Sequence, residues 1–274
     1  MAMCEFCTQH GEGKKWYENA ANYSSELFHR VNSPQGLRDF LAGFRQSLAR
    51  SVGRASALQR RFPWIYRLLI HPRVTRHLKK THFGQVVPIE DVERLLPTLA
   101  SIVRLPCVCR RVTTGGEQRY CFGIGLDLTD IYAQVPDFSG FERWNAEQAL
   151  AFIRELDQRG MVHSLWTFNT PFIGALCNCD QDCLAYRSQH TLAIGRTMWK
   201  GECVAVMDST RCTGCGQCRK RCLFDAIQLI DHQRRRYRIV PELCYGCGVC
   251  RPGCQHDAIG LVERSQVAGA VGDW

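Results

Sequence analysis

Apolar residues in the first third of the chain recur at the spacing of an amphipathic helix, with arginines between them. They are Leu37, Phe40, Leu41, Phe44 and Leu48. Pro63 and Pro72 interrupt the sequence that follows, and proline breaks the hydrogen-bond ladder of a helix. The pattern therefore predicts several short helices, rather than one long helix, between residues 19 and 80.

The following region predicts a helix and then a strand. An apolar stripe at helical spacing ends before Pro106 and consists of Val92, Leu95, Leu96, Leu99 and Val103. A strand is expected over residues 120–127, after a turn that contains two glycines.

A second helix and strand are expected farther along the chain. Asn145 and Gln148 have the spacing of a capping box, and Gly160 is a typical helix stop. Loose alternation over residues 161–168 then predicts a strand. A helix and a strand in this order are compatible with a winged-helix-like unit.

The C-terminal region, residues 204–263, is an internal repeat with a period of 32 residues. In each half, four cysteines are separated by two, two and three residues, and glycines flank the second cysteine. The cysteines are Cys212, Cys215, Cys218 and Cys222, then Cys244, Cys247, Cys250 and Cys254. Strand-like segments flank the two loops at residues 203–207, 228–230, 237–240 and 260–262.

This spacing suits a [4Fe–4S] cluster, which needs four soft thiolates around one inorganic core. Glycines beside the cysteines permit backbone dihedrals that turn amide N–H groups toward sulfur. The fourth cysteine of each half is expected to start a helix on the far side and so to bind the other cluster. The predicted ligand sets are Cys212, Cys215, Cys218 and Cys254 for one cluster, and Cys244, Cys247, Cys250 and Cys222 for the other. Two zinc sites are less favoured, because zinc knuckles have longer gaps between their CxxC pairs.

The repeat resembles the bacterial two-cluster ferredoxin family. That resemblance implies a pseudo-two-fold, ferredoxin-like 2[4Fe–4S] module that transfers single electrons. The chain departs from the family after the fourth cysteines, where Leu223 and Gln255 replace the usual proline. The module also differs from the family in charge, because basic residues surround it. They would balance the negative charge of the clusters or bind an acidic redox partner. These residues are Arg211, Arg219, Lys220, Arg221, Arg234, Arg235, Arg236 and Arg238.

Nine of the seventeen cysteines lie outside the repeat, and their clustering predicts at least one further cluster. The candidate ligands are Cys107, Cys109, Cys121, Cys177, Cys179 and Cys183. Four of these would hold one [4Fe–4S] cluster, and all six with Cys4 and Cys7 could serve two. A structural zinc or free thiols are the alternatives. Cys4 and Cys7 with His10 also read as a metal knuckle or as a frayed terminus, and Cys203 as a core thiol.

The segments around these cysteines look like a poorly characterised family of cytoplasmic iron–sulfur proteins. The segments are 105–110, 121–123, 160–163 and 177–179. Members of that family join a cysteine-bearing α/β domain to a C-terminal two-cluster module. The resemblance implies accessory electron transfer beside a larger oxidoreductase complex.

Composition limits the cellular compartments and the kinds of partner that the sequence suggests. The chain has no apolar signal region and no run long enough to span a membrane, so we expect a cytoplasmic protein with metal-bound thiolates rather than disulfides. Twelve Lys or Arg and a single acid, Asp39, lie between Arg30 and Lys80. A core-packed helix with a solvated arginine face is the favoured explanation. A protein partner, peripheral contact with an anionic membrane and nucleic acid are alternatives, of which nucleic acid is disfavoured.

The sequence thus predicts an α+β chain in four parts. Residues 1–80 form a Cys-bearing N-terminus and a basic helical region, and residues 81–203 a mixed α/β domain with an additional cluster. Residues 204–263 form the two-cluster module, and 264–274 a frayed tail.

The favoured function is single-electron relay to or from a partner oxidoreductase. No radical-SAM, dinucleotide-binding or Walker motif is present, which favours an electron carrier over a catalyst. A redox-sensing regulator that binds nucleic acid and a small-substrate reductase with a site-differentiated cluster are the alternatives.

Overall fold

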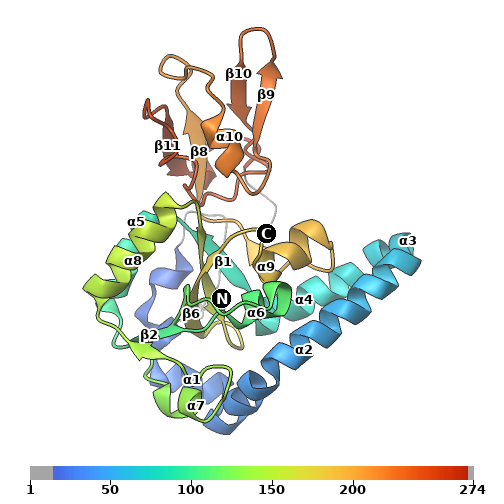
Figure 1. The fold of residues 1–274 in the computed structure, drawn as a ribbon, viewed down its shortest axis with the longest axis vertical. Coiled ribbons are helices and arrows are strands. Elements are labelled where there is room, and N and C mark those ends of the chain that lie inside the picture. The colour runs from blue at the N-terminus through green and yellow to red at the C-terminus, as the bar shows by residue number, and fades with distance from the viewer. Residues whose placement is uncertain (1–14, 271–274) are drawn as a thin grey trace, which may run out of the picture.

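Short runs of apolar and β-branched residues in the middle of the chain form one seven-stranded mixed sheet, and helices surround it (Figure 1). The computed structural model describes residues 15–270. The strand order is β4-β2-β3-β6-β5-β1-β7, and every neighbouring pair is antiparallel except β1 and β7. The strands are β1 (Gly84–Val87), β2 (Ile102–Leu105), β3 (Cys121–Ile124), β4 (Glu142–Arg143), β5 (Val162–Thr167), β6 (Ile173–Cys179) and β7 (Met198–Trp199).

Helices cover both faces of this sheet, because neighbouring strand residues point to opposite sides. Ile102 packs with α5 and α8 on one face, whereas Val103 packs with α1, α2 and α7 on the other. The helices are α1 (Ser25–Val31), α2 (Pro34–Arg61), α3 (Pro63–Ile65), α4 (His71–Thr81), α5 (Ile89–Leu95), α6 (Val108–Thr114), α7 (Thr129–Ala133), α8 (Ala146–Gln158), α9 (Leu184–Tyr186) and α10 (Gln217–Arg221).

The capped helix predicted at Asn145 is confirmed as α8. The Asn145 side chain accepts from the Gln148 amide at 2.8 Å, and the Gln148 side chain accepts from the Asn145 amide at 3.1 Å. Gly160 ends this segment at a φ of +86°, and β5 follows as predicted. However, β5 is buried between β6 and β1 in the sheet, so this segment does not form a separate winged-helix unit.

The predicted break of the basic region into several helices is confirmed, since α2 ends just before Pro63, but the expected helix lengths are wrong in two places. α2 is one helix of 28 residues, because Pro34 stands in its first turn and no proline follows until Pro63. The apolar stripe after Val92 is helical only to Leu95, since Pro97 lies in a 3₁₀ turn and Val103 lies in β2.

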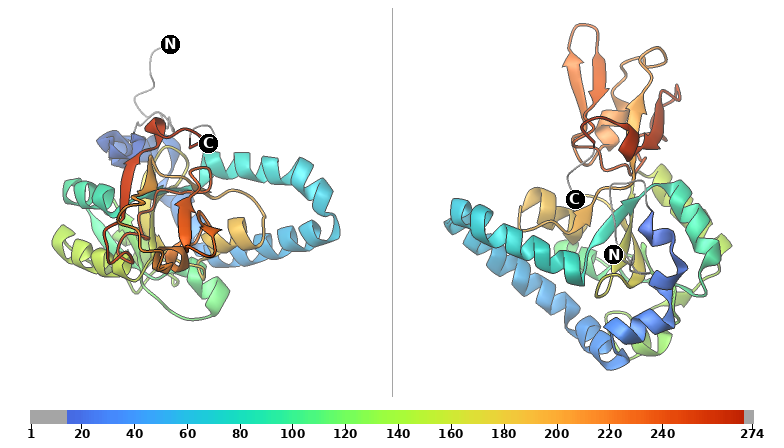
Figure 2. Two further views of the ribbon diagram at one scale, coloured as in Figure 1. Left: turned by 90° about the horizontal axis from the view of Figure 1, so that it is seen from above. Right: turned by 180° about the vertical axis from the view of Figure 1, so that it is seen from behind.

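α2 and α4 form a helical hairpin that extends from the sheet domain (Figure 2). α3 begins at Pro63, and a π-helical turn, Tyr66–Ile70, joins it to α4. A π turn of this kind accommodates Pro72, which cannot complete a regular ladder. The buried Tyr66 hydroxyl donates to the Ile194 carbonyl at 2.9 Å and ties the hairpin to the domain.

The C-terminal region forms two antiparallel strand pairs at one end of the sheet domain (Figure 1). α10 ends at Arg221, so Cys222 follows a helix, and the prediction that it starts one is wrong. β8 (Cys203–Met207) pairs with β11 (Ile259–Glu263), and β9 (Ile227–Asp231) pairs with β10 (Arg236–Ile239).

The segment after β11 is anchored through Arg264, which is fully buried. Its guanidinium donates to the carbonyls of Gly201, Cys203 and Cys244 at 2.7, 2.9 and 2.8 Å. The predicted frayed tail is therefore wrong for residues 264–270, and its remainder, 271–274, lies outside the described residues. No helix within residues 15–270 combines the length and apolar composition needed to span a bilayer.

Arg264→Ala is expected to lower the free energy of unfolding by about 2–4 kcal/mol, because it leaves buried carbonyls without a charged donor. Urea titration followed by circular dichroism measures this change. Arg236→Ala is the control, since Arg236 is exposed, and it should shift stability by less than about 0.5 kcal/mol. Equal stability of the two variants would contradict the anchoring role.

Candidate metal centres

The first candidate centre is a cavity lined by thiols from both halves of the repeat. Cys212, Cys215, Cys218 and Cys254 all line it. Gly214 has a φ of +69°, and a Cβ there would lie 2.2 Å from the Arg235 carbonyl oxygen. Only glycine therefore lets the loop between the first two cysteines close over the cavity.

The second candidate centre mirrors the first. Cys222, Cys244, Cys247 and Cys250 line one cavity. Gly246 has a φ of +71°, and a Cβ there would lie 2.1 Å from the Cys203 carbonyl oxygen. The eight thiols are thus grouped in the two crossed sets that the sequence assigned, while binding of iron by those sets stays a prediction.

Backbone amides point at sulfur in this module. The Ala205 amide donates to the Cys244 sulfur at 3.4 Å, and the Ala258 amide donates to the Cys254 sulfur at 3.3 Å. Burial raises the pKa of Cys218 to about 11 and the pKa of Cys250 to about 12. These thiols therefore need a compensating cation to become thiolates at neutral pH, and iron supplies such a charge.

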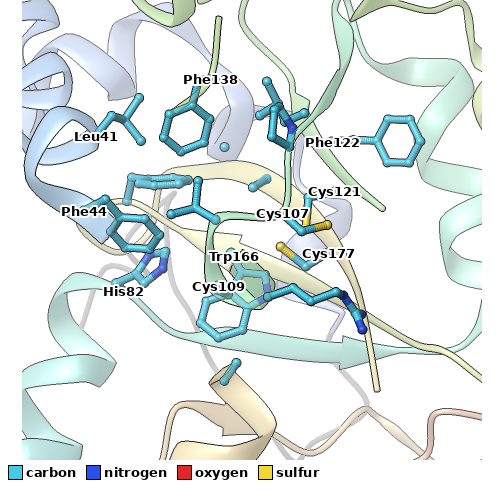
Figure 3. Close-up of a pocket in the computed structure, with 18 of the residues that line it drawn as sticks. Leu41, Phe44, His82, Cys107, Cys109, Cys121, Phe122, Phe138, Trp166 and Cys177 are labelled. Atoms are coloured by element: carbon cyan, nitrogen blue, oxygen red, sulfur yellow. The ribbon is translucent and has the colours of Figure 1, made fainter. Parts of the chain in front are cut away.

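The third candidate centre lies inside the sheet domain, where six thiols line one cavity of about 90 Å³. Figure 3 shows the sulfurs of Cys107, Cys121 and Cys177 close together at this cavity. The Cys107 and Cys121 sulfurs are 3.3 Å apart, and those of Cys179 and Cys183 are 3.0 Å apart. Between residues 15 and 270 every cysteine is a free thiol. The six residues are Cys107, Cys109, Cys121, Cys177, Cys179 and Cys183.

Residues far apart in the sequence reach this cavity because of the sheet. Cys121 opens β3, and Cys177 and Cys179 end the neighbouring strand β6. Cys107 precedes α6 and Cys183 precedes α9. The strands thus supply three thiols, and the α6 and α9 segments supply the other three.

Arg110 supplies a positive charge beside the six thiols. It is buried, it lines the cavity and it binds both Asp180 oxygens at 2.6 and 2.7 Å. Its Nε is buried and has no hydrogen-bond partner in the described part of the chain. An unpaired buried donor beside a thiol-lined cavity fits an anionic sulfur acceptor there, so the residues present suit an iron–sulfur cluster.

Crowding of the six thiols opposes their ionisation. Burial raises the pKa of Cys109, and a hydrogen bond with Cys121 together with burial raises the pKa of Cys107. The pKa of Cys183 is lowered instead, first by a hydrogen bond from Cys179 and further by the charge of Arg110. Cys183 is thus the thiol of this group whose ionisation the surroundings favour, whereas ionisation of several of the six would require metal charge.

The same cavity continues away from the thiols into an apolar chamber. Leu41 and Phe44, both from α2, and Phe138 line its far side (Figure 3). His82 also borders it, and burial lowers the pKa of His82 to about 4. The chamber is therefore uncharged at neutral pH. Sequence reasoning missed it, because its residues are separated along the chain and are ordinary core types.

Aromatic side chains fill the space between the second and third centres. Phe224 stacks on Tyr245 with ring centroids 3.9 Å apart, and His190 contacts both rings. Tyr186, in α9 just after Cys183, stacks on His190 and donates to the Leu223 carbonyl at 2.6 Å. Cys179, Cys183 and Cys247 belong to one hydrophobic cluster with these residues.

Other residues considered from the sequence have structural surroundings. His163 is buried in β5 and contacts Asn178 through Nδ1 at 2.6 Å, and His190 belongs to the aromatic contact. Cys203 is half-buried and lines none of the three cavities. Cys4, Cys7 and His10 lie outside the described residues. Arg110 was also missed as part of the site, although it directly follows Cys109.

Within residues 15–270, no three or more His, Cys, Asp or Glu side chains converge on a point that would hold one metal ion. A cubane binds each of its four thiolates through a different iron, so its ligands surround a core rather than a point.

No protein-family profile matches the chain, and no curated protein or solved structure shows significant similarity to it.

Paired substitutions test the crossed grouping of the repeat cysteines. Cys212→Ala and Cys254→Ala should each remove about four irons, and the double variant should also remove about four, because both thiols belong to one cavity. Cys212→Ala with Cys244→Ala should remove about eight. Iron is measured on anaerobically purified protein, with Cys203→Ala as the control that loses none.

Loss of about eight irons from the Cys212/Cys254 double variant, against about four from each single variant, would contradict the crossed grouping.

Proposed function

We propose that this chain relays single electrons through at least three iron–sulfur centres, two in the C-terminal module and one or more in the sheet domain. One observation carries the proposal: fourteen thiols line three cavities, two with four thiols each and one with six. Bound [4Fe–4S] clusters would supply one-electron redox chemistry at thiolate-held iron. The protein's own residues would bind the clusters, set their order along the chain of centres, exclude water from the inner ones and leave one near the surface.

The order of the centres supports a linear path. Cys215, in the first module cavity, is exposed, whereas Cys244, Cys247 and Cys250 of the second are buried. The second cavity shares a hydrophobic cluster with the thiols of the sheet domain. The second module centre would therefore stand between the inner centre and the solvent-facing one.

The aromatic contact between the inner and middle centres supports transfer between them. Phe224 and Tyr245 are buried and pack face to face, and Tyr186 and His190 close the contact from the sheet domain. Tight packing excludes water and fixes the separation of the two centres. Arg251 holds the same interface from its other side, because it forms an ion pair with Glu90.

The surface around the first module centre, at the solvent-facing end of the proposed electron path, is basic. Arg211, Arg219, Arg234, Arg235 and Arg236 are exposed, and Arg235 contacts the Cys215 carbonyl at 3.5 Å. A positive surface at the exit attracts an acidic partner and speeds the encounter. The proposed partner is therefore a redox protein with an acidic docking surface, alone or as part of a larger oxidoreductase complex.

Reductive titration under anaerobic conditions tests the relay directly. The purified chain should take up at least about three electrons without added substrate, one for each [4Fe–4S] centre. Visible absorbance and electron paramagnetic resonance follow the titration. Uptake of no electrons, or bleaching that requires a substrate, would contradict electron relay.

Charge removal at the proposed exit should slow transfer to an anionic acceptor. Reduced protein with Arg234→Gln, Arg235→Gln and Arg236→Gln should react with ferricyanide about tenfold more slowly at low salt, and salt should narrow the difference. Stopped-flow absorbance measures the rate. The matched triple variant Arg50→Gln, Arg54→Gln and Arg60→Gln, on the distant hairpin, should react at the wild-type rate. Equal slowing by both variants would show that net charge, and not the exit surface, sets the rate.

A second candidate function is reduction of a small apolar molecule at the inner centre. It is favoured by the apolar chamber, which opens onto the thiols and is lined by Leu41, Phe44 and Phe138. A ligand there would lie next to a cluster held by only some of the six thiols. A change in the electron paramagnetic resonance signal of the inner centre on adding small aromatic compounds would support this function. An unchanged signal would oppose it.

A further inference from the structure

The far end of the α2–α4 hairpin exposes bulky apolar side chains in one group. Trp64 is 67 % exposed, Leu68 66 % and Leu69 53 %, and Phe62 beside them is 41 % exposed. Single exposed apolar residues are ordinary, but a cluster of large ones in successive turns marks an interaction surface. We call Phe62, Trp64, Leu68 and Leu69 the hairpin tip.

The hairpin carrying this tip is strongly basic, and Asp39, near the start of α2, is the one acidic residue between Pro34 and Thr81. Residues 40–89 contain ten Lys or Arg and no Asp or Glu. Arg60, Arg61 and Arg67 are exposed around the tip, and none of them forms an ion pair with a residue that the structure describes. The surface is thus apolar at its centre and cationic at its rim.

The hairpin is held against the sheet domain through α4 and through the buried Tyr66, so the neighbouring tip side chains stay on the exposed side of the hairpin. Thr75 Oγ1 accepts from the Arg196 amide at 3.0 Å, and the Tyr66 hydroxyl donates to the Ile194 carbonyl. Val74 packs closely against Gly195. The views from above and behind show the hairpin end standing clear of the remaining fold and apart from the C-terminal module (Figure 2).

These features fit an anionic bilayer surface better than nucleic acid. Nucleic acid would engage the arginines but leave the tryptophan and two leucines in water. A bilayer accepts both, because apolar side chains enter the headgroup boundary while arginines bind lipid phosphates. The indole ring of Trp64 is also suited to that boundary. No described helix is long and apolar enough to cross a bilayer, so the contact proposed is with its surface.

We propose that the hairpin tip inserts into the surface of an anionic membrane, with Arg60, Arg61 and Arg67 on lipid phosphates. The C-terminal module lies apart from the end of the hairpin (Figure 1). Its basic exit surface therefore stays free for the redox partner while the protein is on the membrane. The inference does not depend on the number of clusters.

Vesicle sedimentation with the full chain tests the tip. The protein should sediment with vesicles of phosphatidylglycerol and phosphatidylcholine, and salt should weaken binding. Trp64→Ser with Leu68→Ser should bind about tenfold more weakly, because both residues leave the bilayer. Ile230→Ser is the matched control, since Ile230 is a 52 % exposed apolar residue of the module, and it should bind as the wild type does.

A brominated lipid in the same vesicles gives an independent readout. Tryptophan emission of the wild type should be quenched, and Trp64→Phe should abolish most of that quenching although five tryptophans remain, as the sequence has six. The proposal is overturned if the wild type stays in the supernatant, if the tip variant sediments like the wild type, or if Trp64→Phe leaves the quenching unchanged. Binding to a DNA duplex or an acidic protein without binding to these vesicles would overturn it as well.

Discussion

The main physical constraint on this fold is the burial of many sulfur atoms that ionise only beside positive charge. Fourteen thiols line three cavities, and burial or crowding raises the pKa of most of those for which a shift is resolved. A protein with thiols so arranged is stable with neutral thiols or with metal, and not with bare thiolates. Iron bound at these positions would therefore contribute directly to folding stability. Arg110 and the amides that point at sulfur are arranged to support the charged form.

The fold brings these thiols together through strand pairing rather than through sequence proximity. Pairing of β8 with β11 brings the ends of the repeat together, so each cavity takes its fourth cysteine from the other half. In the sheet domain, adjacency of β3 and β6 brings Cys121 to Cys177. The buried Arg264 and the ion pair of Arg251 with Glu90 then hold the module against the sheet domain. In our account, that attachment keeps the inner and middle centres within reach of each other.

The sequence correctly predicted the elements that depend on neighbouring residues alone. The capping box at Asn145, the strand after Gly160 and the four strands around the repeat all follow from neighbouring residues. The end of α2 before Pro63 was predicted, whereas its length of 28 residues was not. The strand at Val103 was misjudged because its apolar residues continue the helical periodicity past Pro97, where the helix ends.

The six inner thiols were predicted as a group from their spacing. Their common cavity with Arg110, the apolar chamber and the Phe224–Tyr245 contact were not, since each depends on tertiary packing across the sheet. The buried role of Arg264 was missed for the same reason. It follows a strand in a segment of small and polar residues that reads as a loose terminus.

The central claim is that thiols of the sheet domain hold a cluster in addition to the two in the module. Iron and acid-labile sulfide counts on anaerobically purified wild type and Cys179→Ser test it most directly. We predict at least about twelve irons in the wild type, with about four fewer in Cys179→Ser and none lost in Cys203→Ser. A count of about eight irons that Cys179→Ser leaves unchanged, or zinc in place of iron, would contradict it.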